Sequence, residues 1–342
     1  MKKEYIIPIF VPHLGCPNDC TFCNQKKISG QKKNITSVDV KNTIEYYLSN
    51  FQDADKIKVE VAFFGGSFTG IDMNLQEELL SAAYEYIKAG KVDSIRVSTR
   101  PDYIDIDKLK LLKKYGVKTI ELGVQSTNDY ILNKAQRGHN YNDVKKASKL
   151  IRKNKFILGH QMMVGLQDST TKDEIKTAKD LIKLKPKIVR IYPVLVIKDT
   201  KLCTDYLNGD YTPNTVEQAV ETCTTLLKMF RKKKIDVIRI GLQNTDEICG
   251  PENETSQVVA GPYHPAFRQL VESRIFYEEI SKKIKGLNNK VKNVKFVVNK
   301  NQINNFVGHK RENINKIEEL YNINVVIEQS ESEKNFRLVE AY

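Results

Sequence analysis

The chain of 342 residues lacks features that define several classes of protein. It contains no Trp, and no apolar run approaches the ~20 residues that a membrane-spanning helix needs. The basic and then apolar start of the chain is short, is interrupted by Pro8 and Pro12, and has no small-residue cleavage site, which argues against a signal peptide. We therefore expect a cytoplasmic protein that does not associate with membranes.

Acidic residues are outnumbered by basic ones. The chain has 42 Asp and Glu against 55 Lys and Arg, which gives a formal net charge of +13. Hydrophobic residues make up 40% of the chain and charged residues 28%, so the composition is that of a soluble globular protein rather than a disordered or fibrous one. The length allows one large α/β domain with a small appendage.

The six cysteines are too few, in a chain this long, for a secreted disulfide framework. Three of them fall within eight residues, at Cys16, Cys20 and Cys23, and the others are scattered. Clustered thiols in a reducing cytosol indicate a metal or redox site.

No fixed-period repeat is visible, but strand and helix patterns alternate. Apolar, β-branched runs that fit buried parallel strands are separated by stretches with helical periodicity. This alternation predicts a β/α barrel or a doubly wound sheet, and in a barrel the working residues lie on the loops that follow the strands. The expected strands are 6–11, 57–64, 94–98, 119–124, 156–164 and 188–194, and the expected helices include 38–51, 75–89, 107–115 and 173–184.

The rest of the chain predicts one more helix-strand unit and then a separate small domain. The unit covers residues 213–240, and a loop-like stretch follows at 243–265. After a helix at 266–284, the pattern reads strand 295–298, helix 302–306, helix 312–321 and strand 324–328. We expect a barrel domain at 1–286 and an α/β appendage at 287–342.

The cysteine cluster has the spacing C-x3-C-x2-C, directly after the first expected strand. Three thiolates on a short loop can each bind one iron of a 4Fe-4S cluster and leave the fourth iron open to a small molecule. A structural zinc site is the alternative, because His13 is close enough to be its fourth ligand.

This spacing, with the aromatic Phe22 before the last cysteine, resembles the radical S-adenosylmethionine (SAM) superfamily. The resemblance implies a partial (β/α)6-type radical SAM barrel. It also implies that the open iron binds SAM, and that an electron from the cluster cleaves SAM to methionine and a 5′-deoxyadenosyl radical. An electron donor such as a ferredoxin or flavodoxin would then be a partner.

Further motifs lie near the ends of the expected strands: GGSFTG at 65–70, STRPD at 98–102, ELGVQS at 121–126, RGH at 137–139 and GHQMMVGL at 159–166. The set is similar to the radical SAM domain of the catalytic subunit of Elongator, which modifies wobble uridine in tRNA, over roughly residues 5–285. Arg137 would suit the SAM carboxylate, since a guanidinium pairs bidentately with a carboxylate. The resemblance implies these cofactor-binding residues: Gly65, Gly66, Ser67, Ser98, Arg100, Gln125, Arg137 and Gln161.

Two departures from the Elongator subunit limit what carries over. That subunit spaces its first two cysteines further apart, and it has an acetyltransferase domain for which the residues after the barrel are too few. A more distant relation to oxygen-independent coproporphyrinogen oxidase leaves a porphyrin-like small molecule as an alternative substrate.

The tail resembles the helix-turn-helix of a KH domain, whose GxxG loop clamps a nucleic-acid backbone. Gly308 matches the first glycine, and Arg311 stands at the second. Between residues 282 and 311 there are nine Lys or Arg and no Asp or Glu, and such clusters attract phosphates. We expect RNA, and a tRNA base in particular, as substrate. The alternatives are a mere packing appendage and a non-enzymatic RNA-binding protein with a structural metal. The expected RNA-binding residues are Lys282, Lys283, Lys285, Lys292, Gly308, Lys310 and Arg311.

Overall fold

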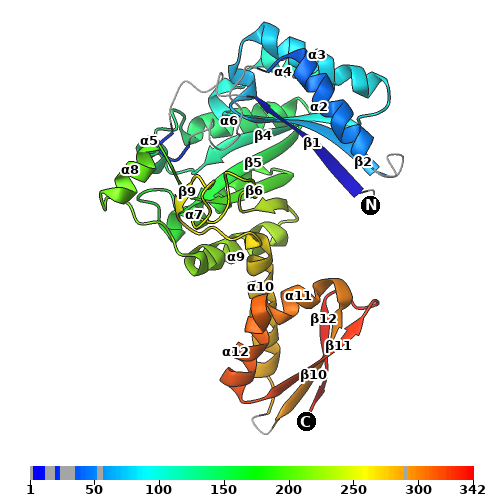
Figure 1. Cartoon of the computed structure of the whole chain (residues 1–342), viewed down its shortest axis with the longest axis vertical. Helices are drawn as coiled ribbons and strands as arrows, with labels where there is room; N and C mark the ends of the chain where they lie inside the picture. The colour runs from blue at the N-terminus through cyan, green and yellow to red at the C-terminus, as the bar shows by residue number, and fades with distance from the viewer. Residues whose placement is uncertain (1–2, 12–19, 24–34, 52–56, 289–290) are drawn as a thin grey trace. The chain divides into compact units, whose positions relative to one another are not determined.

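The computed structural model describes residues 3–11, 20–23, 35–51, 57–288 and 291–342 (Figure 1). The chain forms two compact units. The first comprises the residues up to Thr215 together with Leu226–Tyr263, and the second comprises Val216–Thr225 together with His264–Tyr342. Among the described residues, no helix combines the length and apolar character needed to cross a membrane.

The first unit is built on a seven-stranded sheet in which every neighbouring pair is parallel. The strand order is β1-β2-β3-β4-β5-β6-β8, so the strands follow one another as in a barrel, and β1 and β8 form the two open edges. This arrangement confirms the predicted partial barrel, and the last helix-strand unit supplies the seventh strand. The strands are β1 (Lys3–Val11), β2 (Ile57–Gly65), β3 (Ser94–Thr99), β4 (Val117–Gln125), β5 (Ile157–Val164), β6 (Ile188–Pro193) and β8 (Asp236–Ile240).

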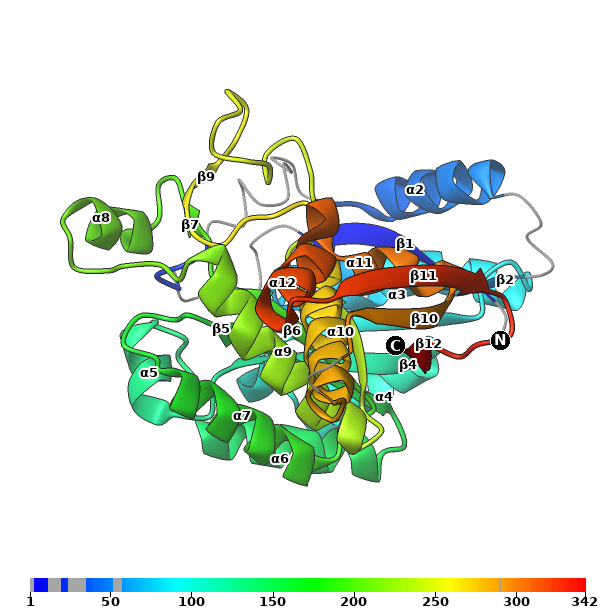
Figure 2. The ribbon, with the colours of Figure 1, turned by 90° about the horizontal axis from the view of Figure 1, so that it is seen from below.

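Helices between the strands cover the outer face of this sheet, as Figure 2 shows for α4, α6 and α7. Their starts are set by local chemistry: Thr36, Asn140 and Thr170 each close a capping box at the first turn of a helix. The helices are α2 (Ser37–Asn50), α3 (Met73–Lys88), α4 (Ile106–Lys114), α5 (Asp129–Lys134), α6 (Tyr141–Lys153), α7 (Thr171–Leu184) and α8 (Lys201–Leu207). Helix α9 (Val216–Lys232) is divided, since Val216–Thr225 belongs to the second unit. A separate two-stranded antiparallel sheet is formed by β7 (Val196–Ile197) and β9 (Val258–Ala260), and the sequence patterns did not predict it.

The two faces of the seven-stranded sheet differ in chemistry. Successive strand residues point to opposite faces, so β2 directs the buried Val61 and Phe63 to the helices and Glu60 to the inside. Arg96 and Glu121 take the corresponding inner positions on β3 and β4. The outer face is therefore an apolar core, and the inner face is polar and carries the candidate site.

The second unit contains α10 (Phe267–Lys285) and a three-stranded sheet of order β11-β10-β12. Strand β10 (Asn293–Asn299) pairs in parallel with β11 (Asn324–Ser330) and antiparallel with β12 (Phe336–Ala341). Helices α11 (Ile303–Val307) and α12 (Glu312–Tyr321) connect β10 to β11. The predicted tail elements are confirmed, whereas β12 was not predicted.

A separate hydrophobic core holds the second unit together. Phe296, Phe306 and Ile314 are fully buried in it, and residues of α10 contribute as well. The predicted domain boundary after residue 286 falls at the C-cap of α10. Helix α10 packs within the second compact unit, although the predicted boundary follows it. The boundary after residue 286 therefore stays a prediction.

Candidate functional site

A small pocket of about 120 Å³ lies where the strands of the first unit end. Every residue that the sequence resemblance implied for cofactor binding lines it, although these residues come from four strands and the loops after them. The structure therefore brings the whole predicted set together. The lining is Cys20, Phe22, Cys23, Gly65, Gly66, Ser67, Ser98, Thr99, Arg100, Gly123, Gln125, Arg137 and Gln161.

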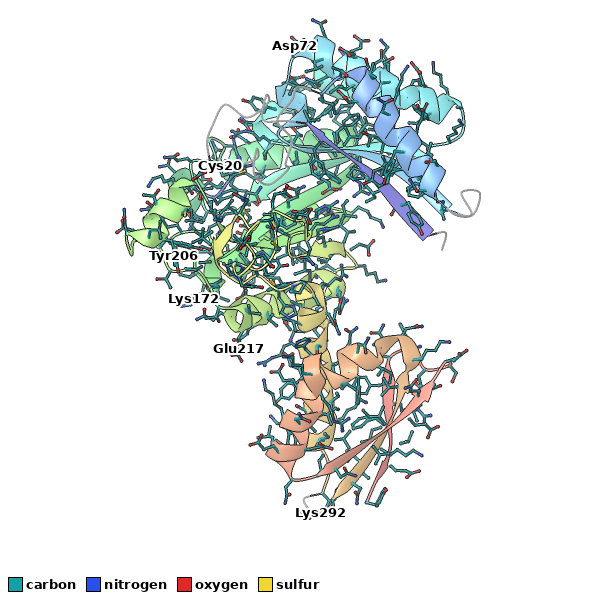
Figure 3. All side chains as sticks on the ribbon, viewed as in Figure 1. Cys20, Asp72, Lys172, Tyr206, Glu217 and Lys292 are labelled. Atoms are coloured by element: carbon teal, nitrogen blue, oxygen red, sulfur yellow. The ribbon has the colours of Figure 1, made fainter. Side chains whose placement is uncertain are left out.

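Two of the three predicted cluster cysteines form part of this pocket. Cys20 is buried and Cys23 is half-buried, and a backbone hydrogen bond of 3.0 Å joins the Cys23 amide to the Cys20 carbonyl. Thr21 anchors the segment, because its amide donates to the Ala135 carbonyl at 3.2 Å. Figure 3 labels Cys20 beside the barrel strands. Cys16 lies outside the described residues, and within them no group of three metal-ligating side chains occurs.

The glycine pair after β2 fits tightly against the end of β1. Gly65 has a φ of +101°, and a Cβ there would come within 2.6 Å of the Val11 carbonyl oxygen. The Gly66 amide donates to the same oxygen at 3.1 Å. A larger residue at position 65 would therefore both clash and be strained, and the loop presents its backbone to the pocket. Ser67 continues the loop, and its hydroxyl lies 2.8 Å from that of Thr99.

Arg137 occupies the wall of the pocket next to Cys20. Its Nη1 donates to the Cys20 sulfur at 3.3 Å, and its Nη2 donates to the Gly123 carbonyl at 2.7 Å. Its Nε is buried without a hydrogen-bond partner among the described residues. Gln125 lies beside it, has a φ of 68° at an irregularity of the β4 ladder, and buries an unpaired Oε1.

Arg100 is the second buried guanidinium in the wall. Its Nε and Nη2 donate to the two carboxylate oxygens of Asp102 at 3.0 and 2.8 Å, while its Nη1 is buried without a partner among the described residues. Burial acts to lower the pKa of Arg100, but Asp102 outweighs it, so the side chain stays charged. Unpaired buried polar atoms cost free energy unless a ligand satisfies them.

Gln161 connects the small pocket to the charged interior of the sheet. Its Nε2 donates to the Ser98 hydroxyl at 3.3 Å and to Glu121 Oε2 at 3.2 Å. Burial acts to raise the pKa of Glu121, but Arg190 and Arg96 outweigh it and hold that pKa below its usual value. The predictions missed Glu121, although a lone carboxylate inside an apolar strand is a signal that it is paired there.

Comparison with known proteins identifies the family. The sequence profile of the radical SAM superfamily matches residues 10–181, and that of the radical SAM C-terminal domain matches residues 186–276. The chain belongs to the radical SAM superfamily. It is thus an enzyme of that superfamily, and the superfamily implies a 4Fe-4S cluster and SAM as cofactors.

Relatives of this radical SAM enzyme include proteins that act on tRNA. A tRNA uridine(34) acetyltransferase of Methanocaldococcus jannaschii is 28% identical over 184 residues, which are 48% of this chain and 34% of that protein. An uncharacterized protein of the same organism is 30% identical over 220 residues, or 61% of this chain and 67% of that protein. The chain spans between about a third and two thirds of the length of these curated relatives.

A solved structure supports the fold. The archaeal Elp3 of Methanocaldococcus infernus, without its residues 1–46, superposes with a TM-score of 0.61 at 21% identity. The match covers 83% of this chain and 64% of that chain.

The residues present fit the cofactors that the superfamily implies. SAM carries an ammonium and a carboxylate group, and the described residues of the pocket wall offer one unpaired acceptor and two unpaired donors. The acceptor is Gln125 Oε1, and the donors belong to Arg100 and Arg137. Two cysteine side chains border the same pocket.

Proposed function

We propose that this enzyme reductively cleaves SAM at a 4Fe-4S cluster held by Cys16, Cys20 and Cys23, and that it uses the resulting radical to modify a tRNA base. The observation that carries the proposal is the gathering of all eight implied cofactor residues around one pocket beside Cys20 and Cys23. When bound, the cluster supplies one electron and SAM supplies the 5′-deoxyadenosyl radical.

The residues of the pocket would act by binding and orienting. Arg137 and Arg100 would bind the carboxylate of SAM with the N–H groups that now lack partners, and Gln125 would accept from its ammonium. Gly65 and Gly66 would let the backbone approach the same end of the cofactor. Arg137 also donates to the Cys20 sulfur, so it would hold a cluster ligand and the cofactor together. The burial of these side chains would exclude water from the site.

RNA as substrate is supported by charge and by the relatives. One relative is a tRNA uridine(34) acetyltransferase. Four lysines in and after α10 are exposed: Lys282, Lys283, Lys285 and Lys292.

The turn at residues 308–311, the basic turn, adds two exposed cations, Lys310 and Arg311. Gly308 approaches α12 so closely that a Cβ would lie 2.8 Å from the Asn313 amide nitrogen. The basic turn thus presents backbone and cations together, which suits a phosphate backbone. A ferredoxin or flavodoxin would deliver the electron.

Anaerobic reconstitution with iron and sulfide tests the enzymatic part. We expect a brown protein that releases 5′-deoxyadenosine from SAM in the presence of a reductant. Cys20→Ala should abolish the release, because it removes a cluster ligand. Cys249→Ala is the matched control and should retain activity, because the Cys249 sulfur contacts the Asp246 carbonyl on a separate loop. A protein that binds zinc instead and leaves SAM intact would contradict the proposal.

Nucleoside analysis tests the substrate. Digested tRNA from cells with the wild-type protein and from cells with Cys20→Ala should differ in one modified nucleoside, as measured by mass spectrometry. Identical profiles, together with absent or salt-insensitive RNA binding, would remove RNA as the substrate.

A further inference from the structure

A larger cavity of about 570 Å³ adjoins the cofactor pocket on the inner face of the sheet. The two share part of their lining, including Gly65, Ser98, Gln125 and Gln161. The cavity therefore opens directly onto the place where the proposed function generates its radical. Its size falls in the range of small-molecule binding sites.

The lining of this cavity is aromatic and carries charge of one sign. Among the described residues that line it, the charged side chains are two arginines, Arg190 and Arg239, and none is a carboxylate. The aromatic rings are Phe10, Phe22, Tyr47, Phe64 and Tyr192. A flat ring with an anionic substituent matches such a lining, because rings stack on rings and a cation attracts an anion in a low-dielectric cavity.

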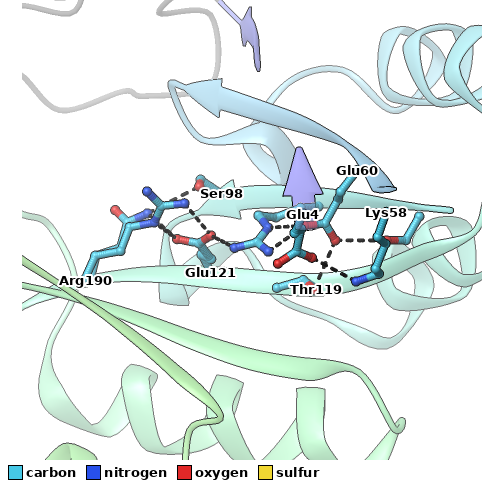
Figure 4. Close-up of polar contacts among 10 residues, drawn as sticks. Glu4, Lys58, Glu60, Ser98, Thr119, Glu121 and Arg190 are labelled. Carbon is cyan, nitrogen blue, oxygen red and sulfur yellow. Dashed lines mark hydrogen bonds and ion pairs between the residues drawn. The ribbon is translucent and has the colours of Figure 1, made fainter. Parts of the chain in front are cut away.

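A row of alternating charges lies behind the cavity wall, and we name these four residues the inner ion ladder: Glu60, Arg96, Glu121 and Arg190. Arg96 donates to Glu60 Oε2 at 2.7 Å through Nε and to Glu121 Oε1 at 2.8 Å through Nη1. Arg190 contacts both oxygens of Glu121, at 2.5 and 3.1 Å. Figure 4 shows Glu121 between Arg190 at one end and the group around Glu60 at the other. The ladder has two charges of each sign, and its end at the cavity is a cation.

Arg190 is held in one orientation by these contacts. Its side chain is 8% exposed, Glu121 holds two of its nitrogens, and its guanidinium carbon lies 5.2 Å from the centre of the Phe64 ring. The Glu121 carboxylate is shared with Arg96 and Gln161, so it does not serve Arg190 alone. A fixed cation costs little reorganisation when an anion binds.

We propose that Arg190 binds a phosphate of the substrate nucleotide while its base lies among the aromatic side chains of this cavity. The inference rests on the proposed function, in which the substrate is RNA. It adds that Arg190 recognises the nucleotide by the negative charge of its phosphate. A base that is turned out of its strand and stacked on such side chains is the geometry that base-modifying enzymes require.

The absence of Trp from the chain makes a cavity-specific assay possible. A single Trp introduced by Phe10→Trp reports entry of a ligand, because Phe10 lines the cavity. The reconstituted, SAM-loaded full chain with this reporter is titrated with uridine 5′-monophosphate and with uridine, which differ only in the phosphate. We expect the monophosphate to bind at least 10-fold more tightly.

The test variants remove the cation with and without its partner. Arg190→Gln alone leaves Glu60 and Glu121 with one cation, and it risks misfolding. The double variant Glu121→Gln/Arg190→Gln leaves the neutral pair of Glu60 and Arg96, so it keeps the ladder balanced. In the double variant the preference for the monophosphate should fall below twofold, while Arg190→Lys should keep part of it. Arg152→Gln, on an exposed helix position, is the control and should leave the preference unchanged.

The outcomes separate this inference from the proposed function. An unchanged preference in the folded double variant, or no preference in the reporter protein, overturns the role of Arg190. If RNA is modified normally by the double variant, Arg190 is likewise excluded while the proposed function stands. If SAM is not cleaved but the preference depends on Arg190, the phosphate site stands and the proposed function fails.

Discussion

The cations of this chain lie in two contrasting settings, the inner ion ladder of the sheet and the basic turn. In the ladder, Arg96 and Arg190 are buried and each contacts a glutamate. At the basic turn, Lys310 and Arg311 are exposed, and both have a positive φ. Neither of them contacts a carboxylate among the described residues. Burial demands a partner because an unpaired charge in a low-dielectric interior is costly, whereas water solvates an exposed cation.

Under the proposed function, the two groups of cations would act on an RNA substrate in different ways. The ladder supplies one cation at a fixed position, Arg190, and in our proposal this cation distinguishes a charged from an uncharged ligand. The basic turn supplies attraction without fixed geometry, and that attraction weakens with salt.

The largest expected effect follows from removing a shared partner in the ladder. Glu121→Gln leaves Arg96 and Arg190 with a single carboxylate, Glu60, so an uncompensated cation stays buried. We expect the free energy of unfolding to fall by about 3–5 kcal/mol, as measured by urea denaturation followed by circular dichroism. Asp107→Asn is the control on an exposed pair with Lys110, and it should cost less than about 1 kcal/mol. An equal decrease in the free energy of unfolding for both variants would mean that burial does not determine how much an ion pair contributes to stability.

Acid should destabilise the folded chain at a buried histidine, because a charge that forms in the interior without a partner is costly. His160 is buried between β5 and α6 and shares a 2.9 Å hydrogen bond with Ser148, and burial lowers its pKa to about 3. The unfolded chain takes up the proton near pH 6.5, whereas the folded chain does not. Stability is thus present above pH 6.5 and is lost as the pH falls toward 3, at about 1.4 kcal/mol per pH unit.

A second buried histidine, His139, should contribute to the same pH dependence, so the contributions of His139 and His160 to stability must be measured separately. Burial also lowers the pKa of His139 to about 3. The slope of stability against pH between 6 and 4 should therefore decrease by one proton in His160→Gln and again when His139→Gln is added. An unchanged slope in both variants would show that neither ring resists protonation.

A smaller decrease in stability is expected when a side chain is added at Gly159, which packs against the inner ion ladder. Gly159 lies on β5 under Glu121, and a Cβ there would come within 2.8 Å of the Glu121 Cγ and 3.0 Å of an Ile188 carbon. Gly159→Ala should cost about 1–3 kcal/mol through overpacking, as measured by thermal and urea unfolding. Gly286→Ala is the control, since its nearest neighbour is at 3.5 Å, and it should be near neutral. A neutral Gly159→Ala would mean that Glu121 can shift without loss.

The smallest effect on folding, but a measurable one on binding, is expected at the basic turn. The double variant Lys310→Gln/Arg311→Gln should leave stability nearly unchanged and weaken RNA binding. The slope of log affinity against log salt should decrease by about 1 for each cation that contacts a phosphate. Lys110→Gln, on an exposed helix of the first unit, should leave the slope as it is. A slope that the double variant does not alter would remove the turn from the RNA-binding surface.

Much of the fold was readable from local patterns. The predicted strands 57–64 and 119–124 match β2 (Ile57–Gly65) and β4 (Val117–Gln125) within a few residues. Such runs are legible because a strand buried on its outer face must be apolar there. The gathering of the motif residues around one pocket was also predictable, because parallel strands bring their ends to one edge. Their binding of SAM stays a proposal.

Three short or edge strands could not be predicted from local sequence patterns. The strands β7 and β9 are two and three residues long and pair across about sixty positions of sequence. Strands this short show no periodic pattern from which they could be predicted. Strand β12 mixes polar and apolar residues at an exposed edge. The role of Cys16 in the cluster stays a prediction, since that residue lies outside the described part of the chain.

The alternation of strands and helices, the cysteine spacing and the excess of positive charge follow from residue type and order alone, because each is a local property of the chain. The ladder of Glu60, Arg96, Glu121 and Arg190 follows only from the folded sheet. These residues are far apart in the chain and meet only because the register of parallel strands aligns their inner positions. Pairing between buried charges depends on distances of a few ångströms, and such distances exist only after the sheet has formed.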